Sequence, residues 1–271
     1  MRGVRGGASL YSGIHHCYRE DSVLRCREMA NKFYEPGEQR ASRVNDLFAA
    51  VAPRYDLIND LQSFGMHRRW KRRLIQLARV RRGERALDLC CGTGDVAFVL
   101  ADEGARVVGL DFSAPMLAVA QARGRRQAEY ANASGNPRFL QGDALKIPFP
   151  DDIFDMVTIA YGLRNLASLE RGLLEMWRVA RPGGRLLVLD FGKPDNPAWR
   201  WLYFGYLKHF VPLFGRLFCG DPETHAYILE SLRHYPAQQG VAARLRELQC
   251  GGIRIVTLLG GVMSINYGEK A

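Results

Sequence analysis

Residues 85–95, RALDLCCGTGD, constrain the fold of this chain more than any other stretch. Their apolar residues predict a buried strand, and Gly92 and Gly94 allow a tight turn without a Cβ between the backbone and a ligand. The apolar run 96–100 then predicts a helix whose free N–H groups face that ligand. A strand, a glycine turn and a helix in this order are typical of nucleotide-binding domains.

Acidic residues mark the ends of neighbouring predicted strands. Asp111 follows strand 106–110, where a carboxylate can accept both hydroxyls of a ribose. Asp143 ends a short strand and can accept a hydrogen bond from an adenine amino group, with the Ala144 backbone beside it. Asp88 would repel a pyrophosphate and suits an ammonium group, which disfavours a nicotinamide dinucleotide although the turn itself fits one. Three acids at successive strand ends resemble the class I S-adenosylmethionine methyltransferases.

Predicted strands and helices alternate from residue 84 onward. The strands are expected at 85–91, 106–110, 138–141, 154–160 and 184–190, and the helices at 95–104, 114–130 and 168–180. This alternation predicts a parallel sheet covered by helices, with ligands at the carboxyl ends of its strands. Two β-rich runs, 253–259 and 262–267, are linked by two glycines and predict an antiparallel hairpin. We therefore expect an α/β protein with the class I S-adenosylmethionine-dependent methyltransferase fold, a Rossmann-like doubly wound, mostly parallel seven-stranded sheet.

The 271 residues suffice for one large α/β domain with additional segments. Residues 1–40 show no periodicity and are expected to be a disordered or non-native extension. Residues 41–82 are expected to be helical; the polar stretch 55–67 within them forms either caps and turns or a lid over a substrate. The methyltransferase domain is expected at 83–271. Its insertion near 197–236 is rich in aromatic residues, as in a core-packing helix or a cap over a lipid-like substrate.

The chain is basic, with a formal net charge of +10. Residues 1–82 hold 17 of the 38 Lys and Arg residues but only 8 of the 28 Asp and Glu residues. Such a surplus favours a nucleic acid or an acidic membrane surface as a neighbour, or else a solvated arginine-rich surface. The six cysteines show no zinc or disulfide spacing, so we expect no metal and reduced thiols in a cytoplasmic location. A plastid location for a eukaryotic source is implied only by the resemblance described below. No run of 18 apolar residues predicts a membrane span.

Five segments resemble one enzyme family. They are APRYDLINDLQSFGMHRRWK, LDLCCGTGD, GDALKIPFPDDIFDMVTIAYGLRN, RPGGRLLVLDFGKP and GGVMSINYG. Over about residues 41–270 the chain resembles the ubiquinone/menaquinone biosynthesis C-methyltransferases, and within them it is most similar to the cyanobacterial and plastid demethylphylloquinone (2-phytyl-1,4-naphthoquinone) methyltransferases. The resemblance implies methyl transfer from S-adenosylmethionine to a ring carbon of a prenylated naphthoquinol, in phylloquinone or menaquinone biosynthesis. A benzoquinol of the ubiquinone or plastoquinone type is the alternative.

The resemblance also implies which residues bind the cofactor. It assigns contacts to Thr93, to Asp111 at the ribose, and to Asp143 with Ala144 at the adenine. Bacterial relatives often carry a serine where Ala160 stands, and alanine lacks the hydroxyl that such a serine offers. The full set of expected cofactor-binding residues is Asp88, Gly92, Thr93, Gly94, Asp111, Phe112, Asp143, Ala144 and Ala160.

Methylation of a quinone ring carbon requires the reduced, deprotonated quinol, because only this form is nucleophilic at carbon. The site must hold the ring, stabilise an oxyanion and accept a proton. Arg164 and Asn165 follow the fourth strand, where both reactants should meet. We expect Arg164, whose pKa above about 12 rules out a role as base, to stabilise the oxyanion, and Asn165 to orient the oxyanion or a water. Tyr55, Asp60 and His67, or a water that they hold, are candidate proton acceptors.

Two other functions remain open from the sequence. The basic N-terminal region would suit an RNA methyltransferase, but no Asp/Asn-Pro-Pro-aromatic run follows the fourth strand. A noncatalytic nucleotide-binding or membrane-associated assembly protein could also keep this fold. We expect a prenylated quinol lipid and no nucleic acid as partner, and we leave open a peripheral membrane contact and a homo-oligomer.

Overall fold

The computed structural model describes residues 40–130, 135–213, 216 and 223–271. The expected extension at 1–40 therefore lies outside the described residues, except for Arg40. Two aromatic residues of the insertion, Phe214 and Phe218, also lie outside them.

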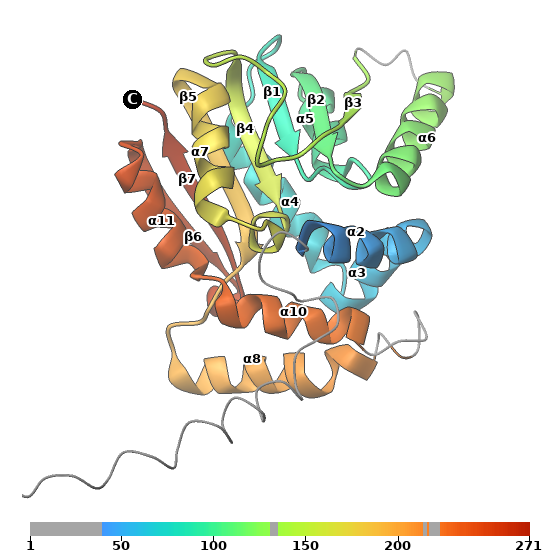
Figure 1. The fold of residues 1–271 in the computed structure, drawn as a ribbon, viewed down its shortest axis with the longest axis vertical. Helices are drawn as coiled ribbons and strands as arrows, with labels where there is room; N and C mark the ends of the chain where they lie inside the picture. Colours follow the sequence, from blue (N-terminus) through green and yellow to red (C-terminus); the bar gives the residue numbers. More distant parts are fainter. Residues whose placement is uncertain (1–39, 131–134, 214–215, 217–222) are drawn as a thin grey trace, which may run out of the picture. The chain divides into compact units, whose positions relative to one another are not determined.

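Seven strands form one sheet, as expected (Figure 1). Their bounds are β1 (Arg85–Leu89), β2 (Arg106–Asp111), β3 (Arg138–Gln141), β4 (Phe154–Ala160), β5 (Ala180–Phe191), β6 (Gly251–Leu258) and β7 (Met263–Glu269). The strand order is β3-β2-β1-β4-β5-β7-β6, with parallel pairing from β3 to β5 and antiparallel pairing of β7 with both β5 and β6. This topology confirms the class I methyltransferase fold and its antiparallel C-terminal hairpin.

Helices lie on both faces of the sheet, with α7 in front and α4 behind in Figure 1. The α-helices are α2 (Arg40–Val51), α3 (Tyr55–Ser63), α4 (Met66–Ala78), α5 (Asp95–Asp102), α6 (Ala114–Tyr130), α7 (Leu169–Val179), α8 (Pro197–His209), α10 (Glu223–His234) and α11 (Ala237–Glu247). Short 3-10 helices are η1 (Ala52–Arg54), η2 (Leu163–Asn165) and η3 (Leu259–Gly261).

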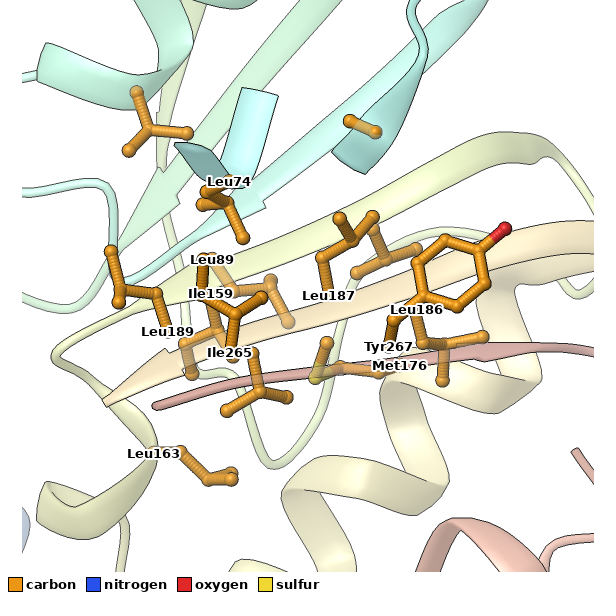
Figure 2. Close-up of a cluster of buried hydrophobic side chains, with 14 of the residues drawn as sticks. Leu74, Leu89, Ile159, Leu163, Met176, Leu186, Leu187, Leu189, Ile265 and Tyr267 are labelled. Atoms are coloured by element: carbon orange, nitrogen blue, oxygen red, sulfur yellow. The ribbon is translucent and has the colours of Figure 1, made fainter. Parts of the chain in front are cut away.

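The core lies between the central strands and the helices that cover them. Figure 2 shows Leu89 of β1 and Ile159 of β4 next to Leu74 of α4, and all three side chains are fully buried. Strands covered on both faces have few positions for polar side chains, which explains the apolar runs in β1, β4 and β5. Truncating one such leucine to alanine would cost about 2–5 kcal/mol, so this core fixes the strand ends that carry the site.

The polar stretch 55–67 does not consist of caps and turns, one of its two expected structures. Pro53 ends α2, but it lies in the first turn of η1, where its missing N–H costs no hydrogen bond, and α3 follows at once. The stretch is therefore mainly helical and buries Ile58. Phe64 and Gly65 have φ values of 50° and 70°, and this left-handed pair separates α3 from α4.

Candidate functional site

Two hollows adjoin the carboxyl ends of the parallel strands. The smaller, of about 100 Å³, is lined mainly by the segments that follow β1, β2, β3 and β4, and we call it the cleft. The larger, of about 1050 Å³, is lined mainly by apolar side chains of α2, α3, α4, α8 and α10, and we call it the cavity. Phe48, Tyr55 and Tyr161 line both hollows and form what we call the shared wall.

Most of the expected cofactor-binding residues line the cleft. They are Gly92, Asp111, Phe112, Asp143, Ala144 and Ala160. The Asp111 carboxylate accepts hydrogen bonds from the backbone N–H groups of Gly92 (2.7 Å) and Ser113 (2.8 Å), which fix it at the end of β2. Burial raises the pKa of Asp111, and these hydrogen bonds oppose the rise. The Asp143 carboxylate is held by the Leu145 N–H at 2.8 Å.

The other three expected cofactor-binding residues do not line the cleft. Asp88 is 1% exposed, lies inside the sheet and accepts a hydrogen bond from the Thr158 hydroxyl at 2.8 Å. Burial raises the pKa of Asp88 to about 7. The Thr93 hydroxyl donates to a carboxylate of α3, and a Cβ on Gly94 would approach Phe139 to 2.8 Å. Thr93 and Gly94 therefore contribute to the packing of the glycine turn, and Asp88 is a buried residue of β1; none of the three lines the cleft.

A charge network connects the glycine turn to the N-terminal helices. Asp56 of α3 accepts the Thr93 hydroxyl at 2.9 Å, and Arg123 of α6 contacts both residues. Asp95, the first residue of α5, pairs with Arg123 at 2.6 Å and with Lys71 of α4 at 2.7 Å. Burial opposes the Asp95 charge, but Lys71 and Arg123 outweigh it and lower the pKa of Asp95 to about 2. Helices α3 and α4 are thus bound to the turn by buried and half-buried charges.

Arg164 and Asn165 lie in η2, directly after β4, and the structure brings them to different hollows. Arg164 lines the cavity, whereas Asn165 lines the cleft. Arg164 Nη1 lies 2.9 Å from Asp190 Oδ1, and its guanidinium lies 4.5 Å from the centre of the Phe191 ring. Burial opposes the charge of Arg164, but Asp190 outweighs it and the pKa of Arg164 is raised. Arg164 is therefore a buried, permanent cation that is paired with the Asp190 carboxylate.

Asn165 connects η2 to the aromatic insertion. Its Nδ2 donates to the Tyr161 carbonyl at 3.1 Å, and its Oδ1 accepts the hydroxyl of Tyr227 of α10 at 3.0 Å. Both amide atoms are therefore held, and the orientation of the Asn165 side chain is fixed by two elements.

Tyr161 has an unusual backbone. Its φ is +61°, a left-handed value that costs a bulky residue about 1–3 kcal/mol. Its N–H donates to the Leu189 carbonyl at 2.7 Å, and its own carbonyl accepts Arg164 Nη1 at 2.7 Å as well as Asn165. The next residue, Gly162, lies so close to Cys90 that a Cβ would approach Cys90 Cβ to 2.5 Å. The turns after β4 and β1 therefore touch, and they hold Tyr161 in this conformation.

The three candidate proton acceptors occupy different places. Tyr55 belongs to the shared wall, and burial raises its pKa. His67 lines the cavity, with Nε2 at 2.8 Å from Asp60 Oδ1. Asp60 lines neither hollow and also pairs with Arg68, whose hydrogen bond, followed by that of His67, lowers the pKa of Asp60. Asp60 thus orients His67 and does not itself reach either hollow.

Four residues of the site were not predicted from the sequence: Phe48, Tyr161, Asp190 and Tyr227. Asp190 carried a usable signal, because it is an acid near the end of a predicted strand, as Asp111 is. Tyr161 directly follows the fourth strand, where the neighbouring pair Arg164 and Asn165 was found by the same argument. The positions of Phe48 and Tyr227 depend on how α2 and α10 pack, and no local motif marks them.

Exposed apolar side chains border the cavity. Trp201 of α8 and Phe64, which follows α3, line it and are each 78% exposed, and Phe210 is 60% exposed. Within the part of the chain that is described, no helix is long and apolar enough to cross a bilayer.

Comparisons with known proteins agree with this geometry. The profile of the ubiE/COQ5 methyltransferase family matches residues 36–270. The ubiquinone/menaquinone biosynthesis C-methyltransferase UbiE of Pseudomonas savastanoi pv. phaseolicola is 43% identical over 238 residues, covering 87% of this chain and 91% of that protein. The UbiE protein of Azotobacter vinelandii is 41% identical over 238 residues, with coverages of 87% and 92%. In fold, the chain is similar to a SAM-dependent methyltransferase from Thermotoga maritima described as a possible histamine N-methyltransferase, with a TM-score of 0.59, 15% identity, and coverage of 83% of this chain and 99% of that one.

Proposed function

Because the chain belongs to the ubiE/COQ5 methyltransferase family, we propose that it methylates a ring carbon of a prenylated naphthoquinol in phylloquinone or menaquinone biosynthesis. The chain is a C-methylating enzyme, and S-adenosylmethionine is its cofactor. One observation supports the proposal most: a small cleft that carries the strand-end carboxylates Asp111 and Asp143 meets a large apolar cavity at the shared wall, with Asn165 on one side and Arg164 on the other.

The residues of the cleft fit S-adenosylmethionine. Asp111 is fixed by two backbone N–H groups at the end of β2, where it can accept the ribose hydroxyls. Asp143 and Ala144 line the same cleft one strand further along, which suits the adenine. Gly92 leaves the backbone of the turn open, and Phe112 adds an apolar side chain. When bound, the cofactor supplies an electrophilic methyl group.

Arg164 is the oxyanion-stabilising residue in this proposal. It is buried, cationic and faces the cavity, so its field acts on a developing quinol oxyanion with little screening by water. Asp190 holds the guanidinium at 2.9 Å, which fixes its orientation before the substrate arrives. Asn165 orients the oxyanion or a water from the side of the cleft, with its own position fixed by Tyr227.

We propose His67, or a water between His67 and Tyr55, as the proton acceptor. Burial raises the pKa of Tyr55, so its hydroxyl stays protonated and orients that water instead of acting as the base. Both side chains line the cavity, and Tyr55 also lines the cleft. Asp60 acts on this step only through the imidazole of His67, since its carboxylate is 2.8 Å from Nε2.

The cavity suits a prenyl-type lipid. Its walls come from the expected lid helices α2–α4 and from helices α8 and α10 of the aromatic insertion, and most of its lining is apolar. A volume of about 1050 Å³ is at the upper end of the range for small-molecule sites. We take the naphthoquinol ring as the substrate because the glycine turn and the aromatic insertion resemble the demethylphylloquinone enzymes most.

Contact with a membrane surface is part of the proposal. Trp201, Phe64 and Phe210 border the cavity and are exposed, as is typical of side chains that enter a bilayer interface. We expect the enzyme to sediment with vesicles of zwitterionic phospholipid, and W201S/F64S to lose about three- to thirtyfold in partition coefficient. The matched control is L140S, which replaces an exposed leucine on β3 outside both hollows. Equal sedimentation of the wild type and W201S/F64S would contradict this contact.

Mass spectrometry of the products tests the function directly. The enzyme is incubated with S-adenosylmethionine and an equimolar mixture of demethylated prenyl naphthoquinols and benzoquinols under a reductant. We expect one additional methyl group on a ring carbon of the naphthoquinol. Methylation of the benzoquinol alone would support the ubiquinone-type alternative, and methylation of added RNA with no quinol product would overturn the proposal.

A further inference from the structure

The hydroxyl of Tyr161 is a buried polar group for which the described residues provide no hydrogen-bond partner. An unsatisfied buried hydroxyl destabilises a folded protein, so its retention calls for a physical reason. Burial also raises the pKa of Tyr161 well above the ordinary value, which keeps the hydroxyl protonated. Tyr161 therefore presents a hydrogen-bond donor that nothing in the described protein uses.

This hydroxyl belongs to a side chain at the junction of the two hollows. Tyr161 lines both the cleft and the cavity, together with Phe48 and Tyr55. Its ring lies edge-on to Phe191, with 6.2 Å between the centroids, and Lys71 Nζ lies 5.8 Å from its centroid. The donor is therefore buried away from water, where a hydrogen bond to a charged oxygen is strong.

Three hydrogen bonds hold the backbone of Tyr161 in a strained, left-handed conformation. A left-handed φ at a tyrosine persists only where the surroundings determine it, and three hydrogen bonds do so here. Two of them come from Arg164 and Asn165, the residues to which we assign the oxyanion. The same two side chains thus hold the backbone from which the Tyr161 ring projects.

We propose that the Tyr161 hydroxyl donates a hydrogen bond to a quinol oxygen, the one attached to the ring carbon adjacent to the carbon that is methylated. This inference rests on the proposed quinol substrate. Tyr161 is then a catalytic residue that shares the developing negative charge with Arg164. It also favours aromatic rings that carry an oxygen beside the reacting carbon, because a ring without that oxygen leaves the hydroxyl unpaired.

Y161F tests the proposal, because it removes only the hydroxyl and keeps the ring in the shared wall. We expect kcat/KM for the quinol to fall by about ten- to hundredfold, as for loss of a hydrogen bond to a charged oxygen. The Kd of S-adenosylmethionine should stay within twofold. Thermal unfolding should occur at the wild-type temperature or above it, since the variant removes an unpaired buried hydroxyl. Y235F is the matched control: Tyr235 is a buried tyrosine that lines neither hollow, and the variant should keep wild-type kinetics.

Three results would overturn the role of the hydroxyl. Wild-type kcat/KM in Y161F would show that it does not contact the ring oxygen. A higher Kd of S-adenosylmethionine with an unchanged KM for the quinol would show that the hydroxyl contacts the cofactor. A lower unfolding temperature would show that the hydroxyl stabilises the fold. A wild-type enzyme that methylates no quinol would instead overturn the proposed function, and this role with it.

Discussion

The cleft and the cavity are neighbours, but they are built in opposite ways. The cleft is formed by short segments after parallel strands, and its polar groups are fixed by the sheet: Asp111 is bonded to the backbone of Gly92 and Ser113. The cavity is formed by helices from two distant parts of the chain and is lined mainly by apolar side chains. The difference shows that sheet topology determines one half of this candidate site, whereas helix packing determines the other.

The two halves also differ in where they place charge. Acids at strand ends face the cleft, whereas Arg164 faces the cavity, with Asp190 behind it. The variants below test whether binding of the cofactor and turnover of the lipid are separable in the same way.

The largest effect is expected for R164M. Turnover of the quinol should fall by about a hundred- to thousandfold, because the charge that stabilises the oxyanion is lost. The Kd of S-adenosylmethionine, measured by calorimetry, should stay within twofold since Arg164 does not line the cleft. The variant leaves Asp190 without its partner, so R164M/D190N is measured beside it to separate folding from chemistry. R246M, at an exposed arginine of α11 that lines neither hollow, is the control. An unchanged kcat in R164M would disprove the assignment.

The second effect is a pH dependence of folding stability, and it comes from Asp88, a buried residue of β1. The pKa of Asp88 is about 7 in the folded protein, above the value of 3.8 for an exposed carboxyl. Between pH 4 and 7 the folded state therefore holds a proton that the unfolded state has released, and stability falls as the pH rises through this window. Across this window the free energy of unfolding falls by about 4 kcal/mol at most, and the fall is complete above pH 7.

D88N should remove this dependence while its amide oxygen still accepts the Thr158 hydroxyl. We expect the free energy of unfolding, measured with urea at pH 4.5, 6 and 8, to vary less with pH in D88N than in the wild type. The stability of D88N relative to the wild type should be greatest at pH 8. D102N, at an exposed acid of α5, should follow the wild-type profile. Parallel profiles for D88N and the wild type would show that Asp88 is ionised throughout.

A smaller effect is expected for D111N. The Kd of S-adenosylmethionine should rise by about ten- to hundredfold, because the ribose hydroxyls lose a charged acceptor. The KM of the quinol should not change, since Asp111 does not line the cavity. D102N again serves as the control for loss of a negative charge. If D111N binds the cofactor as the wild type does, the ribose contact lies elsewhere.

Sequence reasoning predicted the sheet and most of the cleft, because both follow from local patterns. Buried strands read as apolar runs, and the groups that bind ligands come directly after them. β5 begins at Ala180, four residues before its predicted start at 184, because Ala180 pairs with Phe154 across an irregular stretch. Such pairing depends on the partner strand, so the apolar run of β5 alone does not reveal where this strand begins.

The cavity was harder to predict, because its walls combine segments more than a hundred residues apart. Tyr206 of α8, for example, donates to the carbonyl of Gln62 at the end of α3 at 3.2 Å. Amphipathic periodicity tells that a helix packs, but not against which partner. Arg164, which lines the cavity, was singled out because it follows a strand, whereas the positions of Phe48 and Tyr227 depend on how the helices pack.

Helix α3 is fastened at both ends, near its start by Asp56 to the glycine turn and near its end by Gln62 to α8. Redesign of the enzyme for a longer or bulkier lipid is therefore constrained. Shifting α3 would disturb the glycine turn, which we propose as part of the cofactor site, so new tail specificity is better sought among the side chains of α8 and α10. Natural variants that accept different tails should differ most on those two helices and least on α3.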